Sequence, residues 1–223
     1  MKNKRFFLII SFFALLFFSF SYLKISFGLG SYKFFFTGMN FIIPIFGAFF
    51  SFPLTLFFLG VLFFIKKILL GGMITLGVPT LVSTIALNLM FKKENRSSFL
   101  INFGNFIFRV ILPIFAIVTF VMHPVGQQAY LYSFYWLIPI FLYFIKDNSI
   151  FTKALTTTFI AHAIGSLMWL YFIPMTSVQW LSLIPVVAIE RLVFASGMVI
   201  FFLGIKKIIS LNFRRREKKS LVL

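Results

Sequence analysis

Hydrophobic stretches of about twenty residues recur along the chain, and short polar stretches separate them. An α-helix rises about 1.5 Å per residue, so roughly twenty apolar residues suffice to cross a hydrocarbon core of about 30 Å. The pattern predicts hydrophobic helices near residues 6–23, 41–65, 68–90, 99–122, 129–145, 154–173 and 179–205. Because their connections are short, neighbouring helices are expected to be antiparallel in an all-α, polytopic transmembrane bundle.

Lysine and arginine residues are distributed unevenly between the connections. The stretches that carry two, three, two and seven of them are 24–40, 91–98, 146–153 and the chain after 205. The stretches that carry none are 123–128 and 173–178, and Lys66-Lys67 is an exception to the alternation. Because short cytoplasmic loops are enriched in Lys and Arg, the charged stretches are predicted to face the cytoplasm.

Three parts follow from this pattern. They are an N-terminal hydrophobic segment and loop (1–40), a six-span membrane domain (41–205) and a basic cytoplasmic tail (206–223). The protein is therefore expected to be a multi-pass protein of the cell (inner) membrane, with both ends of the six-span core in the cytoplasm.

The first hydrophobic segment does not fit the alternation. Its leading Lys2, Lys4 and Arg5 favour the cytoplasm, so a spanning helix at 6–23 would place the 24–40 loop outside. It is a cleaved signal peptide, an interfacial helix or a true span. In the last case 41–90, which contains Gly71-Gly72, Gly77 and Pro79, includes a re-entrant piece. The sequence leaves these alternatives open.

Composition agrees with a membrane protein. The chain is 61% hydrophobic and 11% charged, and its mean hydropathy is +1.06. The net charge of +17 arises from 21 Lys and Arg against four acidic residues. Because the basic residues flank apolar segments, they indicate contact with anionic membrane lipid and not with nucleic acid. The absence of cysteine excludes disulfides and thiol catalysis.

Four ionisable residues interrupt the apolar segments near their centres: Arg109, His162, Glu190 and Arg191. Charge at membrane depth is costly and usually marks a pathway, a pocket or a structural ion pair. Neighbouring helical residues point about 100° apart, so Glu190 and Arg191 are not expected to pair with each other. Glu190 is expected either to pair with Arg109, which would orient two helices, or to contact a ligand.

A polar stripe is predicted on the helix near 154–173. Its members fall on one helical face: Thr158, His162, Gly165, Ser166 and Trp169. Hydroxyl, imidazole and indole groups would suit the wall of a ligand pocket. The stripe is equally typical of close helix packing, since Ala161 and Gly165 form a pair of small residues four positions apart.

A second stripe contains Asn102, Asn105 and Arg109, again on one predicted face. Polar groups on a transmembrane helix must face protein or water. This stripe is expected to line the same pocket or to supply the partner of Glu190.

The loop at 123–128 is a candidate lid over an outward-facing pocket, and its polar residues are His123, Gln127 and Gln128. It runs into four aromatic residues, Tyr130, Tyr132, Tyr135 and Trp136. Aromatic residues at the end of a span usually form the belt at the membrane interface, and we assign these four to it.

Enzymatic motifs are lacking. The sequence offers no metal-ligand spacing and no glycine-rich phosphate loop. Ser196 with His162 is the one candidate for an intramembrane dyad, but Phe-Ala-Ser-Gly differs from the Gly-x-Ser-Gly of rhomboid-type proteases. We therefore expect no catalytic residues, no metal and no cofactor.

The six-span pattern with short loops resembles the substrate-binding S component of energy-coupling-factor transporters. The resemblance rests on Phe41-Ile-Ile-Pro-Ile-Phe-Gly47, on Gly77-Val-Pro-Thr80 and on the polar stripes of the last two spans. It implies uptake of a vitamin-like micronutrient with a transmembrane coupling subunit and ATPase subunits as partners. The Ala-x-x-x-Ala docking surface of that family is absent from the first segment, and Ala161 and Gly165 are the nearest equivalent.

The sequence thus predicts a membrane protein that binds a small-molecule solute from the uncharged-loop side. The expected ligand-binding residues are Thr158, His162, Ser166, Trp169, Arg109, Glu190 and Arg191. One alternative is a membrane scaffold or assembly protein whose polar residues only lock helices together. Another is an intramembrane enzyme that acts through Ser196 or His162.

Overall fold

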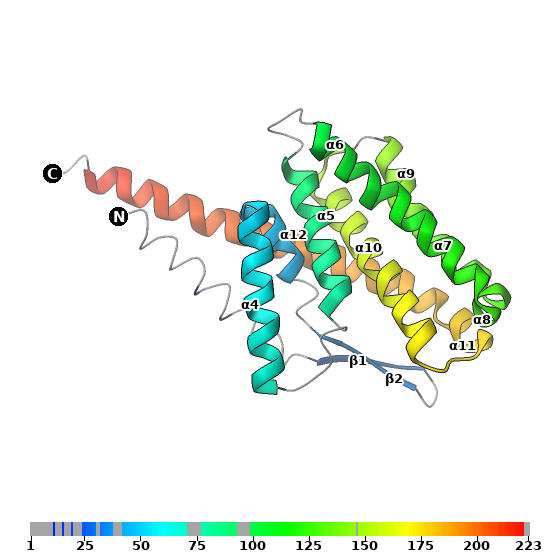
Figure 1. Ribbon diagram of the computed structural model, residues 1–223. Coiled ribbons are helices and arrows are strands. Elements are labelled where there is room, and N and C mark those ends of the chain that lie inside the picture. The colour runs from blue at the N-terminus through cyan, green and yellow to red at the C-terminus, as the bar shows by residue number, and fades with distance from the viewer. Residues whose placement is uncertain are drawn as a thin grey trace.

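A computed structural model describes residues 11, 15, 19, 24–29, 32–37, 42–70, 77–92, 99–145 and 147–220. The described chain is a bundle of helices preceded by one small β-hairpin (Figure 1). Within it, three helical stretches are long and apolar enough to cross a membrane: Phe99–Met122, Ile150–Phe172 and Ile184–Ile208. Three shorter apolar helical stretches are Phe52–Ile65, Val78–Phe91 and Tyr130–Ile145. The protein is therefore a helical membrane protein, as the sequence predicts.

The helical elements follow in chain order as η1 Ile43–Ile45, α3 Phe46–Phe49, α4 Phe52–Leu70, α5 Val78–Lys92, α6 Phe99–Phe106, η3 Ile107–Ile111, α7 Leu112–Met122, α8 Pro124–Gln128, η4 Tyr130–Trp136, α9 Leu137–Ile145, α10 Ile150–Phe172, α11 Ser177–Ser182 and α12 Ile184–Ser220. Helix α10 lies in the middle of the bundle and packs mainly against α5 and α12. The alternatives for residues 1–23 fall outside the described residues, apart from three isolated positions.

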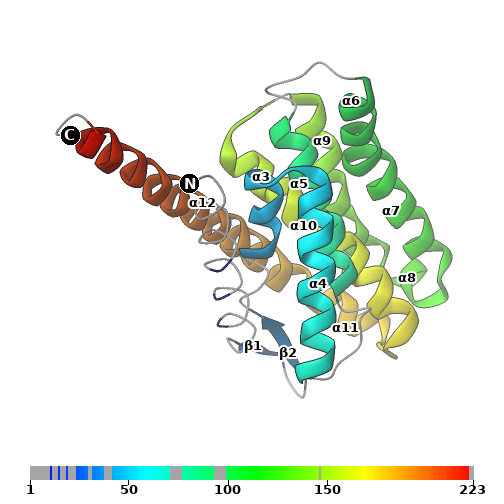
Figure 2. The ribbon, with the colours of Figure 1, turned by 60° about the vertical axis from the view of Figure 1, so that its left-hand side comes forward.

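The connections cluster at two ends of the bundle (Figures 1 and 2). At one end α8 and α11 meet, and the Ser177 hydroxyl donates to Gln128 Oε1 at 2.9 Å. At the other end lies the connection between α9 and α10. There the carboxylate of Asp147 accepts hydrogen bonds from Thr152 and from both the hydroxyl and the backbone N–H of Ser149. These bonds hold the pKa of Asp147 below its usual range.

The hairpin was not expected, because the 24–40 stretch was interpreted as a loop. Strand β1 (Lys24–Leu29) pairs antiparallel with β2 (Tyr32–Thr37), so that Lys24 lies opposite Thr37 and Leu29 opposite Tyr32. The sequence contained the signal: polar and apolar residues alternate along 24–29, and Gly30-Ser31 is a two-residue linker typical of hairpins. In Figures 1 and 2 the hairpin lies at the end of α8 and α11, and not with the charged connections with which it had been grouped.

The predicted span 41–65 is broken. Helix α3 ends at Phe49, the backbone of the next residue, Phe50, is extended (φ −108°, ψ 157°), and α4 starts at Phe52. The break is only partly buried, since Ser51 is exposed, and it follows the fully buried Ile42, Ile43 and Phe46. Irregular backbone at membrane depth is tolerated only where its polar groups are satisfied by protein or water. A re-entrant piece was one alternative, but it was placed near Gly71-Gly72, which lies outside the described residues.

Asn88 on α5 donates hydrogen bonds to the backbone at the break between α3 and α4. Its Nδ2 donates to the carbonyl oxygens of Gly47 and Phe50, both at 2.9 Å, and the side chain is fully buried. Gly47 makes this close approach possible, because a Cβ there would overlap the carbonyl oxygen of Thr84 and the backbone of Asn88. A single amide thus joins α3 and the start of the break to α5.

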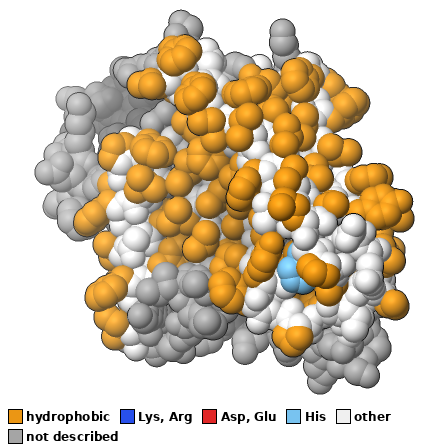
Figure 3. All heavy atoms as spheres, turned by 45° about the vertical axis from the view of Figure 1, so that its right-hand side comes forward, with side chains coloured by type: hydrophobic (Ala, Val, Ile, Leu, Met, Phe, Trp, Pro, Cys, Tyr) orange, Lys and Arg blue, Asp and Glu red, His pale blue; other side chains and the backbone are white. Residues whose placement is uncertain are grey.

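The outer face of the bundle is apolar. Figure 3 shows a surface on which the coloured side chains are almost all hydrophobic, with neither a basic nor an acidic side chain visible among them. Exposed residues of α6, α7 and α9 include Phe103, Phe115, Val118, Phe141 and Phe144. An apolar surface of this extent is what lipid contact requires, so the polar residues of interest must be sought inside.

We predict that Asn88→Leu destabilises the protein strongly. Leucine keeps the volume but removes the donor to the buried carbonyl oxygen of Gly47, at about 1–3 kcal/mol, and to the half-buried one of Phe50. The thermal unfolding midpoint of the detergent-solubilised variant should fall by many degrees. Asn102→Leu is the matched control, because Asn102 is exposed on α6. Equal midpoints for the two variants would contradict the role assigned to Asn88.

Candidate functional site

A chain of four hydrogen-bonded side chains lies inside the bundle. The Trp136 indole Nε1 donates to Nδ1 of His162 at 3.1 Å, and His162 Nε2 lies 2.8 Å from the Tyr132 hydroxyl. The Tyr132 hydroxyl lies 3.3 Å from Oγ of Ser166. All four residues are buried. The chain connects η4, which carries Tyr132 and Trp136, to α10, which carries His162 and Ser166.

The hydrogen bonds fix the tautomer of His162. An indole nitrogen can only donate, so Nδ1 must be an acceptor without a proton. In neutral imidazole the proton is then on Nε2, which donates to the Tyr132 oxygen. The Tyr132 hydroxyl proton is left to reach Ser166, so every bond runs in one direction from Trp136 to Ser166. A proton on Nδ1 would point at the indole N–H and break the chain.

Aromatic rings enclose this chain. Phe120 packs edge-on against Trp136 and Trp180, with ring centroids 5.3 Å apart in both cases. The rings of Tyr132 and Trp180 are 4.8 Å apart. Tyr132 and Trp136 had been assigned to the membrane interface, and the structure instead buries them, to 3% and 0% exposure. Their i, i+4 spacing on one helical face was a signal in the sequence for a shared inward direction.

Glu190 and Arg191 pair with each other, contrary to the prediction. Arg191 Nη2 donates to Glu190 Oε2 at 2.5 Å, and both side chains are buried. The prediction considered only the directions of the Cα–Cβ bonds. Two long side chains on consecutive residues can bend toward each other, and inside an apolar bundle the need to pair the charges outweighs the cost of that conformation.

The pair also contacts helix α10. Arg191 Nη1 donates to the carbonyl oxygen of Thr158 at 3.3 Å, one turn before His162 on the same helix. The positive charge of Arg191 is close enough to His162 and Tyr132 to interact with both electrostatically. The ion pair and the Trp136–Ser166 chain therefore form one buried polar cluster, which we call the η4–α10–α12 cluster.

The pairing within this cluster is incomplete. Glu190 Oε1 and Arg191 Nε are buried and have no hydrogen-bond partner among the described residues. The same holds for Nε1 of Trp180, whose ring packs edge-on against Tyr132. Unpaired polar atoms inside a membrane protein are costly and require an explanation, such as a ligand or water that takes them.

Arg109 lies elsewhere and does not pair with Glu190, as one alternative had it. It is in the π-helical turn η3, and its guanidinium lies over the Tyr143 ring of α9 at 5.3 Å from the centroid. Pro113 explains the turn locally, because it has no N–H to donate to the carbonyl of Arg109 four residues earlier. Nε of Arg109 is buried and has no partner within the described part of the chain.

The predicted Asn102–Asn105–Arg109 stripe is only partly buried. Asn105 is buried, and its Nδ2 donates to the carbonyl oxygens of Leu89 and Ile101, both at 3.1 Å. Asn102 is exposed, although it lies on the same helix, α6, one turn before Asn105. Asn105 is thus a contact between α5 and α6.

The remaining residues of the α10 stripe are divided. Thr158 uses its hydroxyl to donate to the Leu155 carbonyl at 2.8 Å, so its contribution to the cluster is its own carbonyl oxygen. Gly165 faces Pro79 of α5, which agrees with the packing alternative for this position. Trp169 is half-buried against the aromatic rings.

The predicted lid is a short helix, α8, packed on the end of the bundle. His123 begins it, with Nδ1 accepting from the Val125 backbone N–H at 3.3 Å. Gly126 is buried so tightly that a Cβ there would overlap the Phe120 carbonyl oxygen. Gln128 bonds to Ser177 of α11, whereas Gln127 is exposed. In the structure, α8 and α11 together cover the end of the bundle nearest the cluster.

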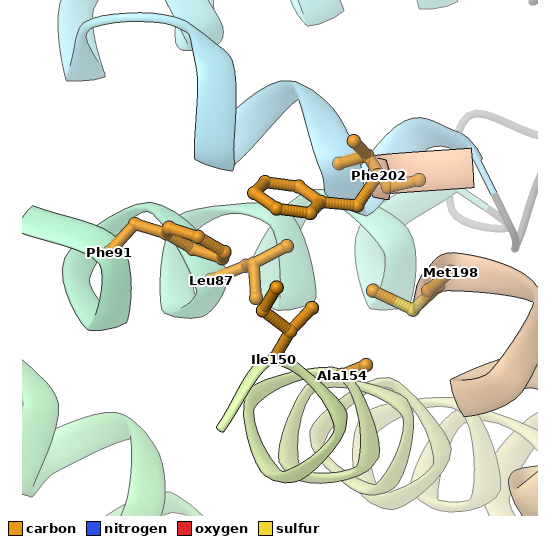
Figure 4. Close-up of a pocket in the computed structure, with 7 residues that line it drawn as sticks. Leu87, Phe91, Ile150, Ala154, Met198 and Phe202 are labelled. Carbon is orange, nitrogen blue, oxygen red and sulfur yellow. The ribbon is translucent and has the colours of Figure 1, made fainter. Parts of the chain in front are cut away.

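A pocket between η1, α5, α10 and α12 is a poor alternative site (Figure 4). Its cavity volume is about 10 Å³, and apolar side chains line it: Ile45, Leu87, Phe91, Ile150, Ala154, Met198 and Phe202. Ligand sites usually exceed about 300 Å³ and contain a few polar groups that fix orientation. This pocket has neither property.

Two further observations concern chemistry. Within the described residues, no group of three or more His, Asp or Glu could hold a metal ion. Ser196 is exposed on α12, whereas His162 is buried with both ring nitrogens bonded to other side chains.

Comparisons with models of protein families, with curated proteins and with solved structures found no match to this chain.

We predict that His162 carries its proton on Nε2 alone. In protein labelled with ¹⁵N-histidine, its Nδ1 should show the NMR shift of an unprotonated nitrogen. The chain has two histidines, so a His123→Gln variant assigns the signals. In Trp136→Phe the donor to Nδ1 is lost, and the Nδ1 shift should move because that nitrogen is no longer hydrogen-bonded. A protonated Nδ1 in the unaltered protein would refute the direction of the chain.

Proposed function

We propose that this protein binds a small solute for uptake, and that the η4–α10–α12 cluster is its binding site. The observation that carries the proposal is the Glu190–Arg191 pair, which is buried in the bundle with one acceptor and one donor unused. A buried ion pair contributes little to stability compared with apolar packing, so stability alone does not explain its presence.

The proposal includes six membrane crossings with the C-terminus in the cytoplasm. The three long and three shorter apolar helices support it, because each corresponds to one predicted segment between 41 and 205. Both uncharged connections lie at the end of α8 and α11, which supports the orientation, whereas the hairpin with Lys24 and Lys33 lies at the same end and runs against the alternation (Figure 1). The solute would then enter from outside, at the end that these two short helices cover.

Each residue of the site has a proposed role. Glu190 and Arg191 contact the solute, and Trp180 can donate a further hydrogen bond. His162, Tyr132 and Trp136 are positioning residues, since their bonds to one another fix η4 against α10. The covering segment with His123, Gln127 and Gln128 must move to admit the solute. Transmembrane coupling and ATPase subunits remain the proposed partners for energising uptake.

A scaffold without ligand is the second candidate. The satisfied hydrogen bonds of His162 favour it, because a pre-formed ligand site would leave at least one of its nitrogens available. In this alternative the cluster only locks η4, α10 and α12 together, and the unpaired atoms of Glu190 and Arg191 are an imperfection of a structural pair.

Native mass spectrometry of the detergent-purified protein tests the proposal. A non-lipid adduct at one copy per chain is expected in the unaltered protein and in the control Glu217→Gln, which alters a carboxylate in the tail. Glu190→Gln keeps the size of the side chain but removes the charge, and adduct occupancy should fall at least tenfold. A protein subunit that co-purifies without any small molecule would instead support the scaffold.

A mutant cycle separates the structural contribution of the ion pair. Glu190→Gln alone leaves the positive charge of Arg191 uncompensated in the bundle, and removing one charge of a buried pair typically costs about 3–5 kcal/mol. The double variant Glu190→Gln with Arg191→Gln should unfold at a higher temperature than either single variant. Independent, additive effects on the unfolding midpoint would show that the two side chains are not coupled.

A further inference from the structure

We propose that the part of the solute bound by Glu190 and Arg191 is an uncharged group with a hydrogen-bond donor and acceptor side by side, as in an amide, a ureido group or a lactam. This inference rests on the proposed function and names the chemical class of the ligand. It follows from which atoms of the ion pair are used and which are not.

The first step concerns the geometry of the pair. Nε and Nη2 are the two donors on one edge of a guanidinium, and they match the two oxygens of a carboxylate in a bidentate pair. Here Nη2 bonds to Oε2, but Nε and Oε1 have no partner among the described residues. Because the two side chains start from adjacent helical positions, only Nη2 and Oε2 form a hydrogen bond with each other. An unused N–H donor therefore lies on the same edge as the bonded Nη2, beside a carboxylate that retains an unused acceptor.

The second step concerns which groups can use both atoms. Nε requires an acceptor, and Oε1 requires a donor. An amide edge supplies a carbonyl oxygen and an N–H about 2–3 Å apart, which is the spacing of such bidentate contacts. A carboxylate would supply two acceptors and leave Oε1 facing another anion. An ammonium group would supply donors only and leave Nε unpaired.

The third step concerns charge. Glu190 and Arg191 neutralise each other, and the described surroundings offer no further carboxylate, since Asp147 lies at the opposite end of the bundle. A charged ligand group in this place would be an uncompensated charge within an apolar bundle. A neutral group leaves the pair balanced. The nearby aromatic rings of Tyr132 and Trp180 suit a flat molecule that carries such a group.

Matched probes of different charge test the inference. Nicotinamide, nicotinate and 3-(aminomethyl)pyridine share a ring and carry a neutral amide, an anion and a cation; uracil and orotate give a second neutral and anionic pair. Each would be added to the purified full-length protein, and binding would be measured by the shift of the unfolding midpoint and by native mass spectrometry. At least one neutral probe is expected to bind at least tenfold more tightly than its charged analogue.

Variants show whether the ion pair makes the contact. Glu190→Gln should weaken the neutral probe at least tenfold, whereas Glu217→Gln should not change its affinity. Tighter binding of a charged analogue, or no binding by either neutral probe, would overturn the inference. If the protein co-purifies with a charged solute that depends on Glu190, the inference fails while the proposed function stands. If no probe binds and no solute co-purifies, both fail.

Discussion

The constraint on which this structure depends is that a polar group inside a lipid-facing bundle must find its partner within the protein. Water is not available to replace a missing hydrogen bond, so each interruption of a helix needs a specific side chain. Asn88 meets this requirement at the break between α3 and α4, where its amide reaches Gly47 and Phe50. Asn105 does the same between α5 and α6. Where partners are complete, as along the Trp136–Ser166 chain, the helices are fixed relative to one another. Single atoms without a partner also occur at Arg109 and at Oδ1 of Asn88, but Glu190 and Arg191 leave two unused atoms within one ion pair, and there function is the more economical explanation.

The helical membrane class could be predicted from the sequence because its signal is the length of apolar segments. The long stretches ending at Met122, Phe172 and Ile208 correspond closely to predicted segments. The break at Phe50 could not be predicted in the same way. Residues 41–65 are apolar both before and after Phe50. A hydropathy profile shows how apolar a segment is, but not whether its backbone changes direction. The determining residue, Asn88, lies on another helix, so the break depends on a tertiary contact. The hairpin at 24–37 is different, since its alternation and its Gly-Ser linker were visible in the sequence.

The site shows a similar division. The sequence identified Arg109, His162, Glu190 and Arg191 because charged or titratable residues are rare in apolar segments. It did not identify their partners, which are set by side-chain conformation and by neighbouring helices. Arg191 was expected to point away from Glu190 and instead bends toward it. Tyr132 and Trp136 were assigned to the interface because of their position near the end of a segment. Only the position of η4 against α10 turns them inward, where they occupy both nitrogens of His162.

The buried polar residues fall into two groups, according to whether all their hydrogen-bond donors and acceptors are used or some remain unpaired. A side chain whose donors and acceptors are all used holds the fold and resists change, because each bond lost leaves a second group unpaired. A side chain with an unused atom can bind something new without first breaking an existing bond. By this argument His162, the residue that drew most attention in the sequence, acts by positioning η4, and Glu190 with Arg191 is the place of first contact for a ligand. The same argument limits the covering helices: α8 is anchored by the tightly packed Gly126, whereas its contact with α11 rests on the exposed Gln128–Ser177 bond. Trp180 holds α11 on the bundle as well, between the rings of Phe120 and Tyr132, so the exposed Gln128–Ser177 bond is the contact at this end that is expected to open most easily.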